Sequence, residues 1–136
     1  MLLCLAGCNR PATAAYGFSI NDVRVLAAYQ SLNVNVRQAL ERIDLPPALS
    51  VLDLATGTGL LAGAFSERGH AVSGLDFADK LLERARRRFP QVDFRHFDLL
   101  HLDRIEADRY DLVSMGYFLH GLSPDFRRHS LRESAR

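Results

Sequence analysis

Three aspartates follow three short apolar stretches of this chain, and their placement suggests a shared ligand. Asp53 lies near the end of the first stretch, and Asp76 and Asp98 come directly after the second and third. Apolar stretches of this length that alternate with helical patterns are typical of the parallel strands of an α/β sheet. Because such strands end at one edge of the sheet, we expect the three carboxylates to border one crevice.

A pair of glycines follows the first stretch. The sequence from Val51 to Gly59 reads VLDLATGTG and continues directly into helix-forming residues. Gly57 and Gly59 lack a Cβ atom, so the backbone can turn with positive φ and a ligand can approach the main chain. The following helix would direct free N–H groups toward that ligand. This order is typical of a nucleotide-binding βα unit.

Each aspartate has both a ligand-binding and a structural interpretation. Asp53 suits a cationic amine better than a phosphate, Asp76 is placed to accept hydrogen bonds from both ribose hydroxyls, and Asp98 is placed to accept one from an adenine amino group. Alternatively, Asp53 satisfies turn amides, Asp76 caps the next helix, and Asp98 is an ordinary loop carboxylate.

The periodicity along the chain predicts one α/β domain. We expect a loose tail over residues 1–18 and a domain over residues 19–136 that begins with one or two short helices before Pro46. Strands are predicted at residues 50–54, 71–75, 92–97 and 110–115, with helices at 60–68, 79–88 and 124–136. Right-handed crossovers then give an open parallel sheet of the Rossmann-like α/β class. The strand order that we infer for it is 3-2-1-4.

Composition excludes several classes of function. The net charge is +1 and 48% of the residues are hydrophobic, so no bulk attraction to nucleic acid or membranes is expected. The histidines and cysteines lack the spacing of metal ligands. Leu5-Ala6-Gly7-Cys8 is similar to a lipoprotein processing box, but no basic residue precedes it and the apolar run is short. A cytoplasmic location is therefore expected.

Several segments in register resemble the successive motifs of class I S-adenosylmethionine-dependent methyltransferases. They read VLDLATGTG, GLDFADKLLERAR, VDFRHFDLL, YDLVSMGYFLHGL and LRESAR. The first is similar to the quinone-biosynthesis and small-molecule subgroup. The resemblance implies S-adenosylmethionine as cofactor and a small-molecule methyl acceptor. It identifies no general base.

The resemblance also implies contacts with the cofactor. Asp53 and the backbone around Ala55, Thr56, Gly57 and Gly59 would hold the methionine part, and many family members carry glycine where Ala55 stands. The remaining implied cofactor contacts are Asp76 for the ribose, the adjacent Phe77, Asp98 with Leu99 for the adenine, and Met115 beside the reactive sulfonium.

Two other interpretations remain open. Gly57, Gly59 and Ala62 also fit a dinucleotide fingerprint, which would suit an NAD-dependent oxidoreductase. In the family, further strands follow the segment that ends here at Arg136, which suggests a truncated, inactive cofactor-binding or partner-dependent fragment. Its strand at 110–115 would then be an exposed edge open to self-association or a partner.

Overall fold

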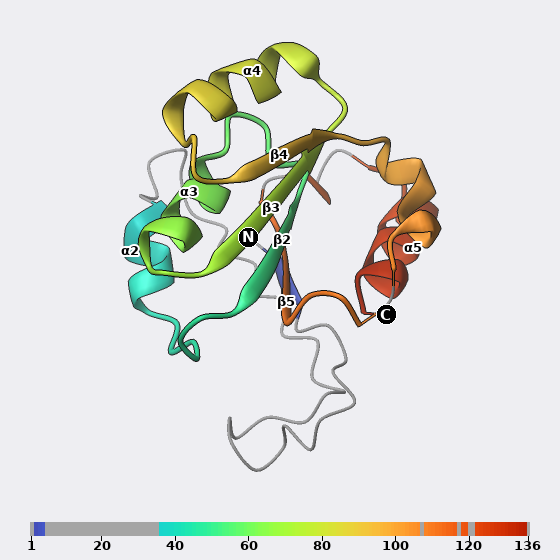
Figure 1. Cartoon of the computed structure of the whole chain (residues 1–136). Coiled ribbons are helices and arrows are strands. Elements are labelled where there is room, and N and C mark those ends of the chain that lie inside the picture. Colours follow the sequence, from blue (N-terminus) through green and yellow to red (C-terminus); the bar gives the residue numbers. More distant parts are fainter. Residues whose placement is uncertain (1, 5–35, 107, 117, 120–121, 136) are drawn as a thin grey trace.

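The computed structural model describes residues 2–4, 36–106, 108–116, 118–119 and 122–135, and its centre is a single sheet of five strands (Figure 1). The strands are β1 (Leu2–Cys4), β2 (Ser50–Leu54), β3 (Ala71–Asp76), β4 (Asp93–His96) and β5 (Leu112–Met115). They are arranged in the order β1-β5-β2-β3-β4. The four strands from β2 to β5 are parallel, so the predicted Rossmann-like sheet and its order 3-2-1-4 are confirmed.

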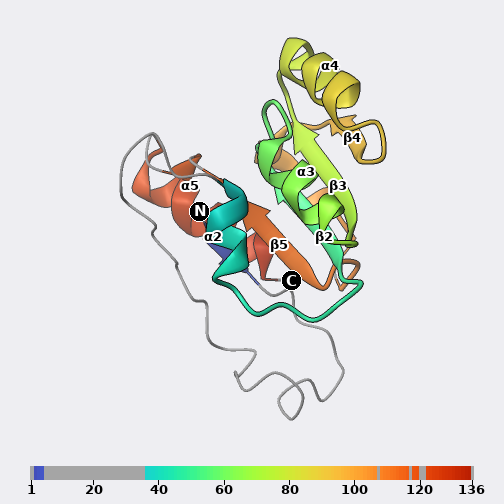
Figure 2. The ribbon, with the colours of Figure 1, turned by 90° about the vertical axis from the view of Figure 1, so that its left-hand side faces the viewer.

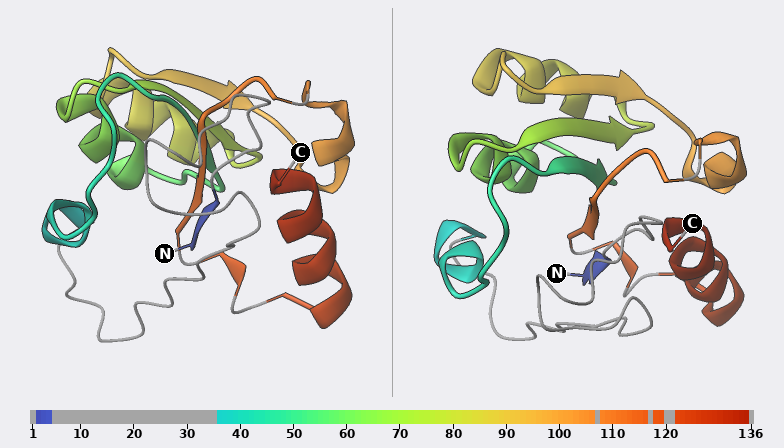
Figure 3. Two further views of the ribbon diagram at one scale, coloured as in Figure 1. Left: turned by 90° about the horizontal axis from the view of Figure 1, so that it is seen from below. Right: turned by 60° about the horizontal axis from the view of Figure 1, so that its bottom comes forward.

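Helices cover both faces of this sheet. They are α2 (Val36–Glu41), α3 (Leu60–Glu67), α4 (Asp79–Arg88), the 3-10 helix η1 (Leu99–Arg104) and α5 (Pro124–Ser134). Figure 2 shows α3 lying along β2 and β3, and in both views of Figure 3 α5 lies on the other side of the strands from α2, α3 and α4. The structure adds η1, where the sequence predicted only a loop. Residues 19–35 of the predicted N-terminal helices lie outside the described part of the chain.

Alternate residues of the strands build two hydrophobic cores. Val51 and Leu112 face α2, α3 and α4 and join a cluster whose largest fully buried side chain is Phe65. Leu52 and Val113 point the opposite way and pack with Leu99 and Leu102 of η1, and with part-buried residues of α5. The central strands β2 and β5 are buried on both faces, whereas β4 at the edge of the sheet exposes Asp93, Arg95 and His96.

The sequence analysis predicted that the strand at residues 110–115, which is β5 in the structure, would be an exposed edge. In the structure β5 has a neighbouring strand on each side. Leu2–Cys4 forms β1 and pairs antiparallel with β5, in a register that places Leu2 opposite Met115 and Cys4 opposite Val113. This short strand belongs to the segment predicted as a loose tail, of which residues 5–18 lie outside the described chain. An apolar strand with open backbone groups gains hydrogen bonds from any extended neighbour, which is the physical reason for the difference.

The turn between β2 and α3 packs closely against β4. Gly59 has φ 77° and caps the start of α3, and a Cβ atom added to it would lie 2.6 Å from Phe94 Cζ. A Cβ atom at Gly74 on β3 would also contact the Phe94 ring, at 2.7 Å. The two glycines therefore let one aromatic ring fill the space between the turn and the sheet, which fixes the position of α3.

Alanine substitutions at the two turn glycines should separate backbone strain from steric conflict. Both residues have positive φ, which costs a non-glycine residue about 1–2 kcal/mol, but a Cβ atom at Gly57 meets nothing within 4 Å. Gly59→Ala adds the clash with Phe94, worth about 1–3 kcal/mol more. Urea unfolding should show that wild type is the most stable protein, Gly57→Ala is less stable, and Gly59→Ala is the least stable. Equal losses would show that Phe94 moves aside freely.

Candidate functional site

The carboxyl ends of the three central strands are aligned and form one edge of the sheet. Leu54 of β2 lies opposite Leu75 of β3 and Met115 of β5 in the strand register. The pairing continues beyond β2, because the Thr56 amide donates a 3.0 Å hydrogen bond to the Leu75 carbonyl. The glycine turn is therefore held at this edge, directly beside the residues that follow β3.

Asp76 connects the glycine turn with the start of α4. Its Oδ2 accepts a 2.8 Å hydrogen bond from the Gly57 amide, and its Oδ1 accepts one of 2.9 Å from the Ala78 amide. Ala78, and not Asp76, is the N-cap of α4, and no side chain caps this helix, so the predicted capping role of Asp76 is wrong. The bond to the Ala78 amide instead fixes the residue that precedes the helix. Each carboxylate oxygen keeps acceptor capacity for a further donor after these bonds are made.

Asp53 lies beneath the turn and not at the lip of the crevice. Its side chain is 1% exposed, and its Oδ1 accepts a 2.6 Å hydrogen bond from the Ser114 hydroxyl of β5. Burial raises the pKa of the carboxyl from 3.8 to about 6, against the opposing effects of the Ser114 hydroxyl, the Thr56 hydroxyl and the Ala62 amide. The Thr56 hydroxyl favours the charge electrostatically, although it makes no hydrogen bond of standard geometry.

The first residue of the turn has a conformation that usually favours glycine. Ala55 has φ 54° and packs part-buried against the core on the α5 side. Gly57 follows with φ 56° and open space where a Cβ atom would stand. The two residues thus share a left-handed backbone, although only one of them is a glycine.

The residues predicted for the adenine side differ in exposure. Asp98 is exposed and caps η1, where its Oδ1 accepts a 3.0 Å hydrogen bond from the Leu100 amide. Phe77, directly after Asp76, is 72% exposed. Leu99 is only 7% exposed because it packs in the core, and its neighbour Leu100 is exposed instead.

Met115 ends β5 at the same edge, but its side chain is buried in the core on the α5 side. The strand ends therefore bring Asp53, Asp76 and Met115 together around the turn. Asp98 lies two residues beyond β4, farther along the edge.

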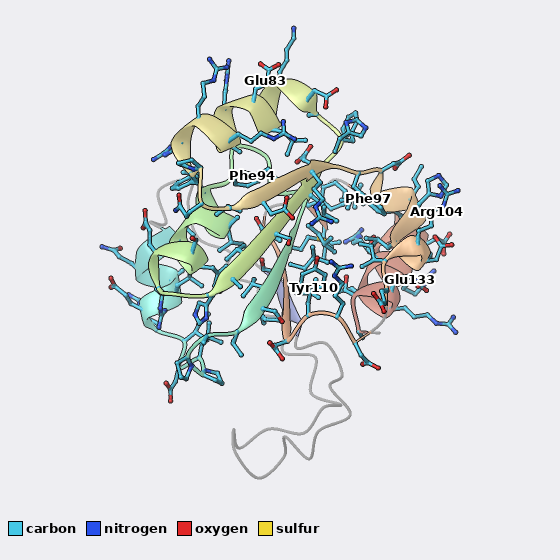
Figure 4. All side chains as sticks on the ribbon, viewed as in Figure 1. Glu83, Phe94, Phe97, Arg104, Tyr110 and Glu133 are labelled. Atoms are coloured by element: carbon cyan, nitrogen blue, oxygen red, sulfur yellow. The ribbon has the colours of Figure 1, made fainter. Side chains whose placement is uncertain are left out.

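A small cavity lies on the α5 side of the sheet and reaches Leu54 at the end of β2. Tyr110 and Glu133, labelled in Figure 4, border it together with Leu52, Val113 and Ser134. Its volume is about 30 Å³, whereas pockets for small ligands usually measure about 300–1,000 Å³. It can hold little more than water, so the candidate site is the edge where the glycine turn, Asp76 and the strand ends meet.

Ser114 is the residue of the site that the sequence analysis missed. The signal was a single hydroxyl inside the apolar stretch Leu112–Met115. A lone serine in a buried strand is usually satisfied locally, and nothing in the sequence alone indicates that its register brings it to Asp53.

Within the part of the chain that the structure describes, no helix has the length and apolar character needed to cross a bilayer.

Comparison with known proteins assigns the chain to a family. The profile of a family described as a methyltransferase domain matches residues 51–136. The chain therefore belongs to the methyltransferase domain family. The match begins at β2 and includes the glycine turn, Asp76 and Asp98.

Individual relatives agree with this assignment. The chain is 30% identical over 108 residues to a demethylmenaquinone methyltransferase of Bacillus cereus (strain B4264). This match covers 74% of the chain and 44% of the relative, so the chain spans less than half the length of the curated relatives it matches.

Solved structures show the same fold. A TehB-like SAM-dependent methyltransferase from Corynebacterium glutamicum is 27% identical with a TM-score of 0.62, and the match covers 76% of this chain and 57% of that one. A phosphoethanolamine N-methyltransferase from Haemonchus contortus, solved with S-adenosylhomocysteine, has a TM-score of 0.67 at 20% identity and covers 76% of this chain and 23% of that one. The second similarity concerns the fold alone.

Asp53→Asn should remove a specific pH dependence of stability. The native protein keeps the Asp53 proton up to about pH 6, whereas the unfolded chain releases it near 3.8. Because the unfolded state binds fewer protons between these values, this group lowers the free energy of unfolding as pH rises from about 4 to 6 and has no further effect above that. Urea unfolding should show wild type losing stability relative to the variant by about 2 kcal/mol over this interval. If the free energies of unfolding of wild type and Asp53→Asn changed in parallel with pH, the raised pKa of Asp53 would be contradicted.

Ala55→Gly should relieve strain in the turn. A left-handed backbone costs alanine about 1–2 kcal/mol, and glycine avoids this strain. Part of the resulting gain in stability is lost because glycine loses more conformational entropy when the chain folds. The matched control is Ala48→Gly, because Ala48 has φ 56° but is exposed. Thermal unfolding should show stabilisation in both variants, and less at Ala55 because its methyl group packs on the core. A lower melting temperature for Ala48→Gly than for wild type would show that the strain term is overestimated.

Proposed function

We propose that this domain binds S-adenosylmethionine and transfers its methyl group to a small-molecule acceptor. The observation that carries the proposal is the Asp76 carboxylate, which is hydrogen-bonded to the glycine turn and lies at the carboxyl end of β3. A carboxylate at this position of a βαβ unit can accept hydrogen bonds from ribose hydroxyls. The family assignment supports the same chemistry.

The residues of the edge fit an adenosyl cofactor. The open space at Gly57 leaves the turn backbone accessible, and the exposed ring of Phe77 offers an aromatic surface beside Asp76. We assign the methionine part to the backbone from Ala55 to Gly59, supported from below by Asp53.

The positions of Asp76 and Asp98 also suggest where the adenosine part of the cofactor binds. We assign the ribose to Asp76 and the adenine to Asp98, with Leu99 beneath it in the core and Phe77 beside it. Met115 would lie beside the sulfonium, as part of the floor at the end of β5.

The bound cofactor would supply an electrophilic methyl group, whose transfer breaks its bond to sulfur as the acceptor's nucleophile forms a bond to carbon. The protein's contribution is to align the two reactants and to exclude water, which suffices for a large part of the rate enhancement. The proposal therefore assigns no general base.

A small-molecule acceptor is supported by the relatives with named activities. The Bacillus cereus relative is a demethylmenaquinone methyltransferase, which favours a quinone-type acceptor as the finer hypothesis.

A thermal-shift comparison tests the cofactor class first. S-adenosylhomocysteine should raise the melting temperature and NAD should not. The opposite result would favour an oxidoreductase, and binding without transfer of a labelled methyl group would favour a cofactor-binding fragment.

Asp76→Ala should weaken S-adenosylhomocysteine binding by roughly ten- to a hundred-fold in calorimetry, because hydrogen bonds to a charged group are worth about 1.5–3 kcal/mol. The variant also frees the Gly57 and Ala78 amides, so a test of direct contact is needed. The 2′-deoxy analogue of the ligand should bind wild type more weakly than the parent does. It should bind Asp76→Ala about as well as the parent does. Equal losses in both proteins would show that Asp76 acts only on the turn.

A further inference from the structure

The bond between Ser114 and Asp53 joins two strands beneath the glycine turn. Asp53 lies directly opposite Ser114 in the register of β2 and β5, and the Ser114 hydroxyl donates a 2.6 Å hydrogen bond to Asp53 Oδ1. Ser114 is fully buried, so water cannot replace this donor. The bond therefore has a defined geometry that depends on both strands.

Asp53 is surrounded by hydrogen-bond donors, and one charged side chain acts on it. The groups that favour its ionised form are the hydroxyls of Ser114 and Thr56 and the Ala62 amide in the first turn of α3. Asp76 of β3 is the charged group that acts on it, with the opposite effect. Among the elements packed against Asp53, β5 carries no ionisable side chain, and α3 carries none before Glu67.

Protonation of Asp53 would change the contacts of the turn. An ionised carboxylate only accepts hydrogen bonds, so the Ser114 hydroxyl donates to it. A protonated carboxyl also carries a donor, and a hydroxyl that accepts from it must direct its own proton elsewhere. Protonation also removes the negative charge that the Ala62 amide, in the first turn of α3, favours. The shape of the turn is thus linked to the charge of a residue that lies underneath it.

We propose that Ser114 is a positioning residue for cofactor binding, which keeps Asp53 ionised beneath the glycine turn and thereby sets the pH below which affinity is lost. The inference rests on the proposed function, because it concerns the same adenosyl site. Ser114 itself touches no ligand in this scheme. It acts through Asp53 and the backbone of the turn.

The test is the dissociation constant of S-adenosylhomocysteine between pH 5.5 and 8, measured by calorimetry on the full chain. In wild type, affinity should fall as pH drops through about 6, where Asp53 becomes protonated. Ser114→Ala removes a hydrogen bond to a charged acceptor and should move this midpoint upward by about one pH unit. The variant should bind about fivefold more weakly than wild type at pH 6 and equally well at pH 8.

Matched variants separate the hydrogen bond from packing. Ser114→Thr and Ser114→Val have nearly the same shape, but only threonine keeps the hydroxyl, so Thr should retain the wild-type midpoint and Val should shift it. Ser130→Ala is a control at another fully buried serine, whose hydroxyl has no partner in the described part of the chain. It should leave the pH profile unchanged.

An independent measurement follows Asp53 itself. The side-chain carboxyl carbon of Asp53, observed by NMR in the ligand-free protein, should titrate at a higher pH in Ser114→Ala than in wild type.

The possible results are distinguishable. If wild type binds no S-adenosylhomocysteine at any pH, the proposed function fails and this inference fails with it. If wild type binds but Ser114→Ala loses the same factor at every pH, or Asp53 titrates identically in both proteins, the inference alone is overturned.

Discussion

The hydrogen bonds of the Asp76 carboxylate are the constraint on which the site depends. One oxygen holds the Gly57 amide of the turn after β2, and the other holds the Ala78 amide at the start of α4. The turn between β2 and α3 and the segment between β3 and α4 are thereby fixed relative to each other at the end of β3. The turn can be open toward a ligand because its position is set from the side by Asp76 and from below by Phe94 and Asp53.

The second level of organisation is the separation of the two faces of the sheet. On the α3 side, the strands carry small or polar residues near their ends, namely Asp53, Gly74 and Ser114, and these leave room for the turn and for the Phe94 ring. On the α5 side, Leu54, Leu75 and Met115 form a continuous apolar layer. The polar chemistry is therefore confined to one face of the edge.

Much of this architecture could be predicted from the sequence because its signals are local. The strand ending at Leu54, the paired glycines and the helix that follows are encoded within one short segment, and the alternation of strands and helices indicates that the strands are parallel. The contact between Asp53 and Ser114 could not be predicted, because it depends on the register of two strands that are distant in sequence. The burial of Leu99 was missed because η1 replaces an expected loop and turns that side chain into the core.

The placement of β1 has a consequence for the order of folding. Its residues pair with β5, so these contacts connect nearly opposite ends of the described chain, whereas β2, β3 and β4 are joined by short βα units. The entropy lost on closing a loop grows with its length, and contacts of high sequence separation form slowly. The parallel sheet and its glycine turn can therefore assemble from neighbouring units first. We therefore expect the antiparallel strand β1 to dock last, onto an edge that is already formed.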